Sequence, residues 1–205
     1  MTVGRLLRVT GWRLVGRYYR PLRYLAVVPD LAKLQELVLF IAEQTKDDPD
    51  FGRTKLAKVL YYSDFEAYRQ HGESLTGATY ERREHGPFPR QLRTAEEALQ
   101  RAGRAYLTTG QDEFDPKRIL PRPGARADLS AFDKAPLARV AHWIGRIQPL
   151  TARQASDWSH EEPGWQLAAV DRAEIPLHTA RISRRAPTKH DFRRGRDLAR
   201  DHGWP

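Results

Sequence analysis

The sequence predicts a mainly α-helical domain, formally α+β, in which a compact set of helices surrounds a central buried helix, with a small β-hairpin or short antiparallel sheet on one side. Three observations predict this class. Residues 54–71 contain no Asn, Gly or Pro and are apolar over most of a helical surface. Residues 31–45 repeat apolar side chains at helical spacing, and residues 104–121 contain two short apolar segments separated by an acidic turn.

The first predicted helix covers residues 31–45, with Asp30 as its N-cap. The apolar positions that define it are Leu31, Leu34, Leu37, Val38 and Ile41. Because the connection to residue 54 is short, we expect this helix to pack beside the central one.

The central helix is predicted to begin with Thr54 as its cap and to end at His71-Gly72, a cationic last turn followed by a glycine stop. A helical wheel places two apolar stripes on it and leaves a narrow polar arc, on which Tyr62 also lies. The charged residues of this polar arc are Lys55, Lys58, Glu66 and Arg69.

Asp64 falls between the two apolar stripes, so we expect its carboxylate to be buried. Burial of a carboxylate costs several kcal/mol unless it accepts hydrogen bonds. The candidate donors follow soon after in the sequence: Ser74, Thr76, the backbone around Gly77, Tyr80 and His85. The favoured interpretation is a structural acid that fixes the loop to the helix, and a catalytic carboxylate is the alternative.

Residues 74–84 are predicted to form a loop and a short strand, with Tyr80 on its inner face. The segment that follows contains two prolines, which fix φ, and Gly86, which permits backbone conformations denied to other residues. It is therefore predicted to be a stiff corner. Pro89 is expected to be the first residue of a helix that stops at Gly103.

The remaining elements are predicted from caps and spacing. Ser130 is expected to cap a long helix and Thr151 a short one. Residues 173–177 are predicted to form an edge strand, and residues 189–202 are predicted to form a helix within a solvated tail. The long helix is identified by Phe132, Leu137, Val140, Ile144 and Ile147.

A length of 205 residues and a net charge of +9 suit one domain with two basic ends. We divide the chain into a basic N-terminal extension (1–28), expected to be disordered or an artefact of the start site, a domain (29–180) and a basic tail (181–205). Without cysteine, disulfides and thiolate zinc sites are excluded. No apolar run reaches about 18 residues, so no membrane contact is predicted, and the cytoplasm fits.

Catalytic and metal-binding patterns are weak. His71, His85 and His160 lie near acidic residues in the sequence, but none has the helical spacing of a metal-binding motif. There is no Gly-x-Ser-x-Gly motif and no glycine-rich phosphate loop. We therefore predict no catalytic residue, no metal and no cofactor. A hydrolase that uses Asp64 and His85 is the third alternative.

Large aromatic side chains outside the predicted helix cores are the candidate partner contacts, because aromatics on stiff turns anchor interfaces. They are Tyr62 on the polar arc, Phe88 between two prolines, and Trp158 and Trp165 around a turn. For the two tryptophans, closing the core is the favoured interpretation.

A series of short motifs runs through the domain in a fixed order. They are Lys55-Leu56, Leu60-Tyr61-Tyr62-Ser63-Asp64, His71-Gly72, Thr76-Gly77, Tyr80, His85-Gly86-Pro87, Pro89, Leu129-Ser130, Asp133, Ser156-Asp157, Ser159-His160, Pro163 and Trp165. Through these residues, positions 31–180 resemble the SocA-like, or Panacea-domain, antitoxin family of bacteria and phages. The resemblance implies a type II antitoxin that neutralises a cognate protein toxin by direct binding, with an ATP-dependent unfoldase-protease as a further partner if it acts as an adaptor. The alternative is a DNA-binding transcriptional regulator that acts through its basic ends.

Overall fold

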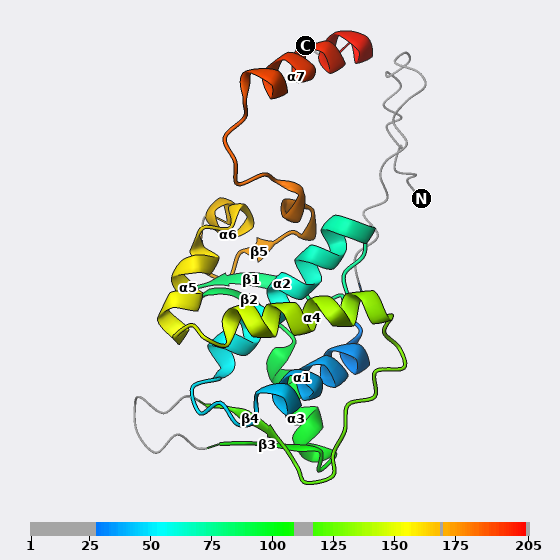
Figure 1. The fold of residues 1–205 in the computed structure, drawn as a ribbon, viewed down its shortest axis with the longest axis vertical. Helices are drawn as coiled ribbons and strands as arrows, with labels where there is room; N and C mark the ends of the chain where they lie inside the picture. The colour runs from blue at the N-terminus through cyan, green and yellow to red at the C-terminus, as the bar shows by residue number, and fades with distance from the viewer. Residues whose placement is uncertain (1–27, 109–116, 169, 204–205) are drawn as a thin grey trace, which may run out of the picture.

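The structure is a computed structural model, which describes residues 28–108, 117–168 and 170–203. These residues form helices with two small antiparallel sheets, so the predicted mainly α class is confirmed (Figure 1). The elements are α1 (Leu31–Thr45), α2 (Arg53–His71), β1 (Tyr80–Arg83), β2 (Gly86–Pro89), α3 (Leu92–Arg101), β3 (Ala105–Leu107), β4 (Ile119–Pro121), α4 (Lys134–Ile147), α5 (Ala152–His160), α6 (Pro163–Leu167), β5 (Glu174–Ile175), the short 3₁₀ helix η1 (Leu177–Arg181) and α7 (Lys189–His202).

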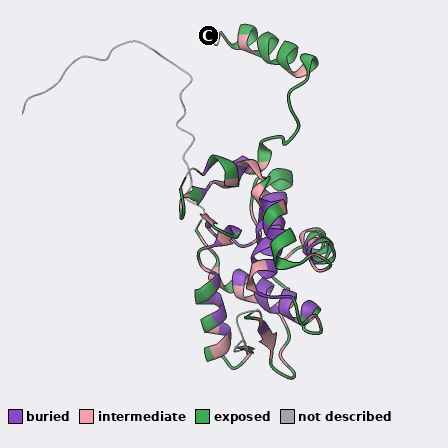
Figure 2. Cartoon of the chain, turned by 90° about the vertical axis from the view of Figure 1, so that its left-hand side faces the viewer, coloured by how far each residue is buried: buried purple, intermediate pink, exposed green. Residues whose placement is uncertain are grey.

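Helix α2 is the centre of the fold, as predicted. Every residue from 55 to 67 is buried, and α4, α5, β2 and η1 all pack against it. Figure 2 shows this continuous buried stretch inside the surrounding elements. The helix ends at Gly72, which adopts φ +83° and donates its N–H to the Tyr68 carbonyl. The predicted cap was wrong: Gly52 is the N-cap, in an extended conformation, so Thr54 already lies inside the first turn.

The predicted polar arc of α2 is largely buried. Lys55 and Lys58 are 2% and 1% exposed, and Glu66 is 8% exposed, because α4 and the β1–β2 hairpin cover this side as well. The charged groups have partners there: the Lys55 ammonium donates to the Gln148 carbonyl at 2.9 Å, and Glu66 accepts from the Trp143 indole at 2.7 Å. A helical wheel that counts only α2 cannot show these partners.

The three-stranded sheet has the order β2-β1-β5, with both pairs antiparallel, and β3 pairs with β4 in a separate hairpin. The predicted hairpin, edge strand and inward-facing Tyr80 are confirmed; the acidic turn, residues 109–116, lies outside the described residues. The segment predicted to be a stiff corner is strand β2, and the predicted helix start at Pro89 was wrong. Pro89 pairs with Tyr80 at the end of β2, so α3 begins only at Leu92.

Two predicted caps are confirmed and one is corrected. Asp30 caps α1 by accepting from the Lys33 N–H, and Thr151 forms a capping box at the start of α5. The cap of α4 is Asp133 rather than Ser130. The Ser130 N–H instead donates to the Asp128 carboxylate in a turn, and the helix begins only at Lys134.

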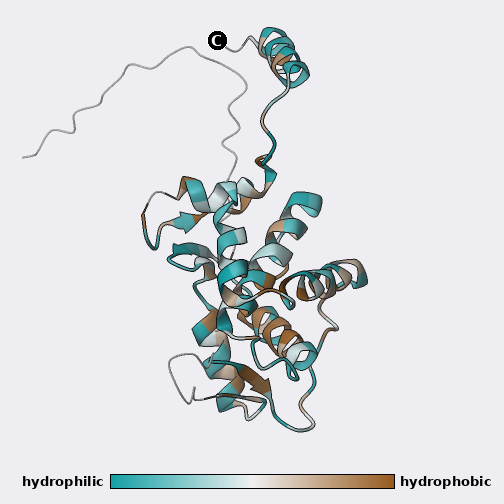
Figure 3. Ribbon diagram, turned by 60° about the vertical axis from the view of Figure 1, so that its left-hand side comes forward, coloured by the Kyte–Doolittle hydropathy of each residue, from teal (hydrophilic) through white to brown (hydrophobic). Residues whose placement is uncertain are grey.

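The core lies where α1, α2, α3 and α4 meet, and Figure 3 shows that hydrophobic residues concentrate there. None of the helices within the described residues is both long and apolar enough to span a bilayer. Helix α7 agrees with the predicted 189–202 range and has no buried residue. The predicted N-terminal extension lies outside the described residues, apart from Val28, which is exposed.

Candidate functional site

The buried carboxylate of Asp64 holds the loop after α2, as predicted. Oδ1 accepts the Thr76 N–H at 2.9 Å, while Oδ2 accepts the Thr76 hydroxyl at 2.6 Å and the Tyr80 hydroxyl at 2.7 Å. Burial raises the pKa of Asp64, and these hydrogen bonds lower it in turn. Ser74 is not a donor to Asp64; its hydroxyl accepts the N–H of Gly77, which has φ +64°.

The other end of the β1–β2 hairpin rests on Lys58. Its ammonium donates to the carbonyls of His85 and Pro87, at 2.5 and 3.1 Å, and the Ser156 hydroxyl donates to the same His85 carbonyl at 2.7 Å. The predicted contact from His85 to Asp64 is absent: the described His85 side chain is exposed, and its backbone makes these contacts.

The two prolines of β2 fit this arrangement. Backbone groups two residues apart point to the same edge of a strand, so Pro87 and Pro89 share the outer edge, away from β1. A proline there removes an N–H that would have no partner in the sheet. On this edge, Lys58 and Ser156 bind the carbonyl of His85, and Lys58 also binds that of Pro87.

Gly86 fits where no other residue does. It has φ +94°, and a Cβ added to it would lie 2.1 Å from the Ser159 hydroxyl and 2.6 Å from the Lys58 ammonium. The glycine therefore lets the hairpin approach both α2 and α5 closely.

An open groove of about 840 Å³ lies beside this hairpin, between the first turns of α2, the β1–β2 turn and α6. Two of the predicted partner residues, Phe88 and Trp165, line it and are half-buried. The complete lining is Arg53, Thr54, Ala57, Lys58, Arg82, Arg83, Glu84, His85, Gly86, Phe88, Trp165 and Asp171.

Trp165 is held on its side of the groove by β1 and α5. The Arg82 guanidinium lies 3.6 Å from its ring centroid and donates to its carbonyl at 2.7 Å, while the His160 ring stacks on it at 4.0 Å. The Trp165 indole N–H donates to the Arg83 carbonyl at 3.2 Å. Burial lowers the pKa of His160, as does the nearby Lys58. Trp165 is thus firmly held and half-buried at the groove.

The remaining predicted site residues lie away from the groove. Tyr62 is 5% exposed and stacks on Trp143 with ring centroids 4.5 Å apart, so its placement on a polar surface was wrong. Trp158 packs against the same two rings, at 5.4 and 6.1 Å. His71 and Asp157 are exposed, beyond the groove lining.

Two residues of the site were missed from the sequence, Lys58 and Arg82. Arg82 could have been predicted, because the two-residue period of a strand places it on the same face as Tyr80. Lys58 gives a weaker signal: it stands between Ala57 and Val59 in a helix that is apolar on most sides. In the described part of the chain, no three His, Asp or Glu side chains cluster as a metal site would need.

The Lys58 environment gives a pH-dependent prediction. Burial lowers the pKa of Lys58 from 10.5 to about 7. Between these values the unfolded chain binds a proton that the folded chain releases, so the free energy of unfolding rises with pH, by up to about 1.4 kcal/mol per unit. Below pH 7 both states are protonated, and the penalty of burying the charge is fully present.

We expect this rise to be missing in Lys58→Met, which keeps an unbranched apolar stem. Urea unfolding of both proteins at pH 6.5, 7, 8 and 9 measures it. Above pH 7 the free energy of unfolding of wild type should rise relative to that of the variant. His160 titrates below this window, because its pKa is lowered from 6.5. If the free energies of unfolding of the two proteins change equally with pH, the prediction is wrong and Lys58 stays charged in the folded protein.

Comparison with known families shows to which family the chain belongs. The family described as antitoxin SocA-like, Panacea domain, matches residues 56–166, which is more than half of the chain. The matched range includes the Asp64 contacts, the β1–β2 hairpin and Trp165. No curated protein and no solved structure matches the chain.

Proposed function

Because the chain belongs to the SocA-like antitoxin family with a Panacea domain, we propose that it is a cytoplasmic type II antitoxin that neutralises a cognate protein toxin by direct binding. The groove beside the β1–β2 hairpin is the proposed contact surface. In this proposal the protein acts by binding, without a catalytic residue or a cofactor.

The observation that carries the proposal is the convergence of the family motif on a single hairpin. Asp64 fixes the loop before β1 through Thr76 and Tyr80. At the other end, the carbonyl of His85 is bound by two side chains, and Gly86 allows the close approach. The Asp64 carboxylate and the Lys58 ammonium both bind backbone groups of the loop and the hairpin, although Lys58, His85 and Gly86 also line the groove. Their arrangement favours a rigid platform for a partner.

The surface offered by this platform has the composition of a protein interface. Phe88 and Trp165 supply half-buried aromatic area, and Arg82 supplies a guanidinium already fixed on Trp165. Aromatic and arginine side chains dominate the binding energy of interfaces. Because these side chains are held before binding, little conformational entropy is lost on contact.

The groove is also nearly balanced in charge. Arg53 forms a two-point ion pair with Glu96, at 3.0 and 2.6 Å, and Arg83 pairs with Glu81 at 2.5 Å. Desolvation raises the pKa of Glu96, which its bonds to Arg53 lower in turn. The proposal therefore assigns the affinity to packed aromatic area more than to net charge.

Growth rescue tests the proposal. The protein encoded by the adjacent reading frame is expressed alone and together with this chain, and the complex is isolated through a tag on the antitoxin. We expect Phe88→Ala to weaken the complex by about 30-fold, the equivalent of about 2 kcal/mol for an interface anchor. Asp171→Arg, on the exposed rim of the groove, should weaken it without a change in melting temperature.

The matched control is Tyr106→Ala. Tyr106 is a 37%-exposed aromatic on the separate β3–β4 hairpin, so its loss should leave both rescue and affinity unchanged. If Phe88→Ala and Asp171→Arg rescue growth as well as wild type, the groove is not the contact surface. If the neighbouring protein neither stops growth nor binds the chain, the antitoxin proposal itself fails.

The same strains distinguish two routes of neutralisation. Simple masking leaves the toxin level unchanged in the complex, whereas delivery to an ATP-dependent unfoldase-protease shortens the toxin half-life only when the antitoxin is present. A pulse-chase of the toxin, with and without the antitoxin, measures this difference.

A further inference from the structure

Both ends of helix α7 are capped by residues of the helix and its immediate neighbours, without contacts from the domain. Thr188 and Asp191 form a capping box, in which the Thr188 hydroxyl accepts the Asp191 N–H at 3.2 Å and the Asp191 carboxylate accepts the Thr188 N–H at 2.8 Å. At the other end Gly203 adopts φ +65°, and its N–H caps the last turn. The helix is thus defined by its own residues, although none of them is buried.

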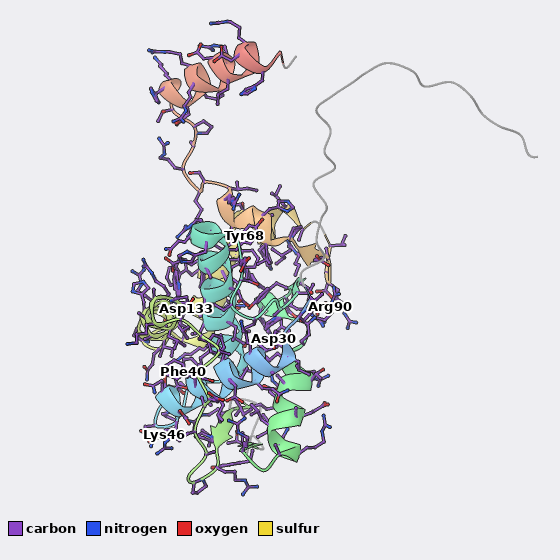
Figure 4. All side chains as sticks on the ribbon, turned by 90° about the vertical axis from the view of Figure 1, so that its right-hand side faces the viewer. Asp30, Phe40, Lys46, Tyr68, Arg90 and Asp133 are labelled. Carbon is purple, nitrogen blue, oxygen red and sulfur yellow. The ribbon has the colours of Figure 1, made fainter. Side chains whose placement is uncertain are left out.

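The helix stands apart from the domain at the end of a short connection (Figure 4). Its connection begins at a fixed point: Arg184 pairs with Glu161 and Glu162 of the domain, and Arg181 lies 5.1 Å from the Tyr68 ring centroid. The structure therefore presents α7 as a separate surface, away from the groove between α2 and α6.

One face of α7 is cationic. At 100° per residue, four basic side chains fall within an arc of roughly 60° and extend over about 16 Å of helix. The acidic residues lie outside this arc; Asp191 is engaged by its capping box and by Arg185 at 2.9 Å, and Asp197 forms an ion pair with Arg200 of the arc at 3.6 Å. The basic face consists of Lys189, Arg193, Arg196 and Arg200.

The rest of the helix does not suit a membrane surface. Its large apolar side chains are Phe192 and Leu198, 59% and 42% exposed. They are six residues apart, which separates them by roughly 120° around the axis, so they do not form one apolar stripe. Insertion into a lipid interface needs a continuous apolar face.

We propose that the basic face of α7 is a nucleic-acid site that binds the phosphate backbone of duplex DNA. An isolated helix is about 10–12 Å wide, which fits the major groove of about 12 Å. Four guanidinium or ammonium groups along one side of it can contact phosphates and release the condensed counterions. This binding reads no base sequence, and it is separate from the toxin contact proposed above.

The test is fluorescence anisotropy of the full chain with a labelled 24-base-pair duplex of arbitrary sequence, between 50 and 200 mM NaCl. The basic-face variant carries Lys189→Gln, Arg193→Gln, Arg196→Gln and Arg200→Gln; glutamine keeps a good helix propensity, and circular dichroism checks the helix content. We expect the slope of log K against log [salt] to become shallower by about 3 to 4, with at least a 30-fold loss of affinity at 50 mM.

The matched control removes four exposed arginines from the domain, through Arg93→Gln, Arg101→Gln, Arg126→Gln and Arg153→Gln. It changes the net charge equally, so any general charge effect appears in both variants. The proposal predicts a control slope within about 1 of wild type. An equal loss in the control, no wild-type binding to the duplex, or binding of α7 to phosphatidylserine vesicles in place of DNA would overturn it.

Growth rescue by the basic-face variant separates this site from the toxin contact. The variant should rescue as fully as wild type while it fails to bind DNA. If the groove variants rescue growth as well as wild type, the DNA-binding result is unaffected, because the two measurements use different surfaces and different probes. Loss of rescue in the basic-face variant would instead assign α7 to the toxin and overturn the DNA site.

Discussion

Asp64→Ala is expected to lower the free energy of unfolding by about 3–5 kcal/mol. The substitution leaves three buried donors without an acceptor, namely the N–H and hydroxyl of Thr76 and the hydroxyl of Tyr80. Each stranded donor costs roughly 1–3 kcal/mol, and relief from burying a carboxylate offsets part of the sum. Such a loss is a large fraction of the stability of an ordinary domain.

Urea unfolding at pH 7 measures this effect, with two comparisons. Asp64→Asn keeps one acceptor oxygen and should lose less than the alanine variant. Asp157→Ala removes an exposed carboxylate from α5, in the same family motif, and should stay within about 0.5 kcal/mol of wild type. A loss below 1 kcal/mol for Asp64→Ala would mean that Thr76 and Tyr80 find other acceptors, and Asp64 would no longer be the structural acid of the loop.

Gly86→Ala should be nearly as harmful, with a loss of about 2–5 kcal/mol. The backbone at φ +94° disfavours any side chain by roughly 1–2 kcal/mol, and the added methyl group would overlap Ser159 and Lys58, an overpacking that costs roughly 1–3 kcal/mol more. Thermal and urea unfolding of the variant measure the sum of the two effects.

A control and a rescue separate conformation from overlap. Gly103 also has a positive φ, +66°, but an added Cβ there meets nothing within 4 Å, so Gly103→Ala should show the conformational cost alone. Adding Ser159→Ala to Gly86→Ala removes the closest overlap and should recover part of the stability. Equal losses for the two glycine variants would contradict the close approach at Gly86.

The features that could be predicted from the sequence are those that depend on neighbours along the chain. Asp64 lies between two apolar stripes of its own helix, and its donors follow within sixteen residues. Its burial and its partners Thr76 and Tyr80 could therefore both be predicted. The cap of α1 at Asp30 and the capping box at Thr151 are equally local.

The features that could not be predicted depend on elements distant in sequence. Lys58 looks solvent-exposed on a helical wheel, yet its partners are carbonyls of the β2 edge and it is covered by the hairpin. Tyr62 was placed on a surface because Trp143, which stacks on it, comes about eighty residues later. Pro89 has the φ of a helix start, but pairing with Tyr80 keeps it in the strand.

The proline edge of β2 also limits how copies of this protein associate. An exposed strand edge is a template on which another chain can add a strand, which leads to aggregation or domain swapping. At β2 that template lacks N–H donors at Pro87 and Pro89, and its carbonyls at residues 85 and 87 are already bound from within the chain. Growth of the sheet by strand addition is therefore blocked at this edge, so the contact proposed at the groove would depend on side chains rather than on a shared sheet.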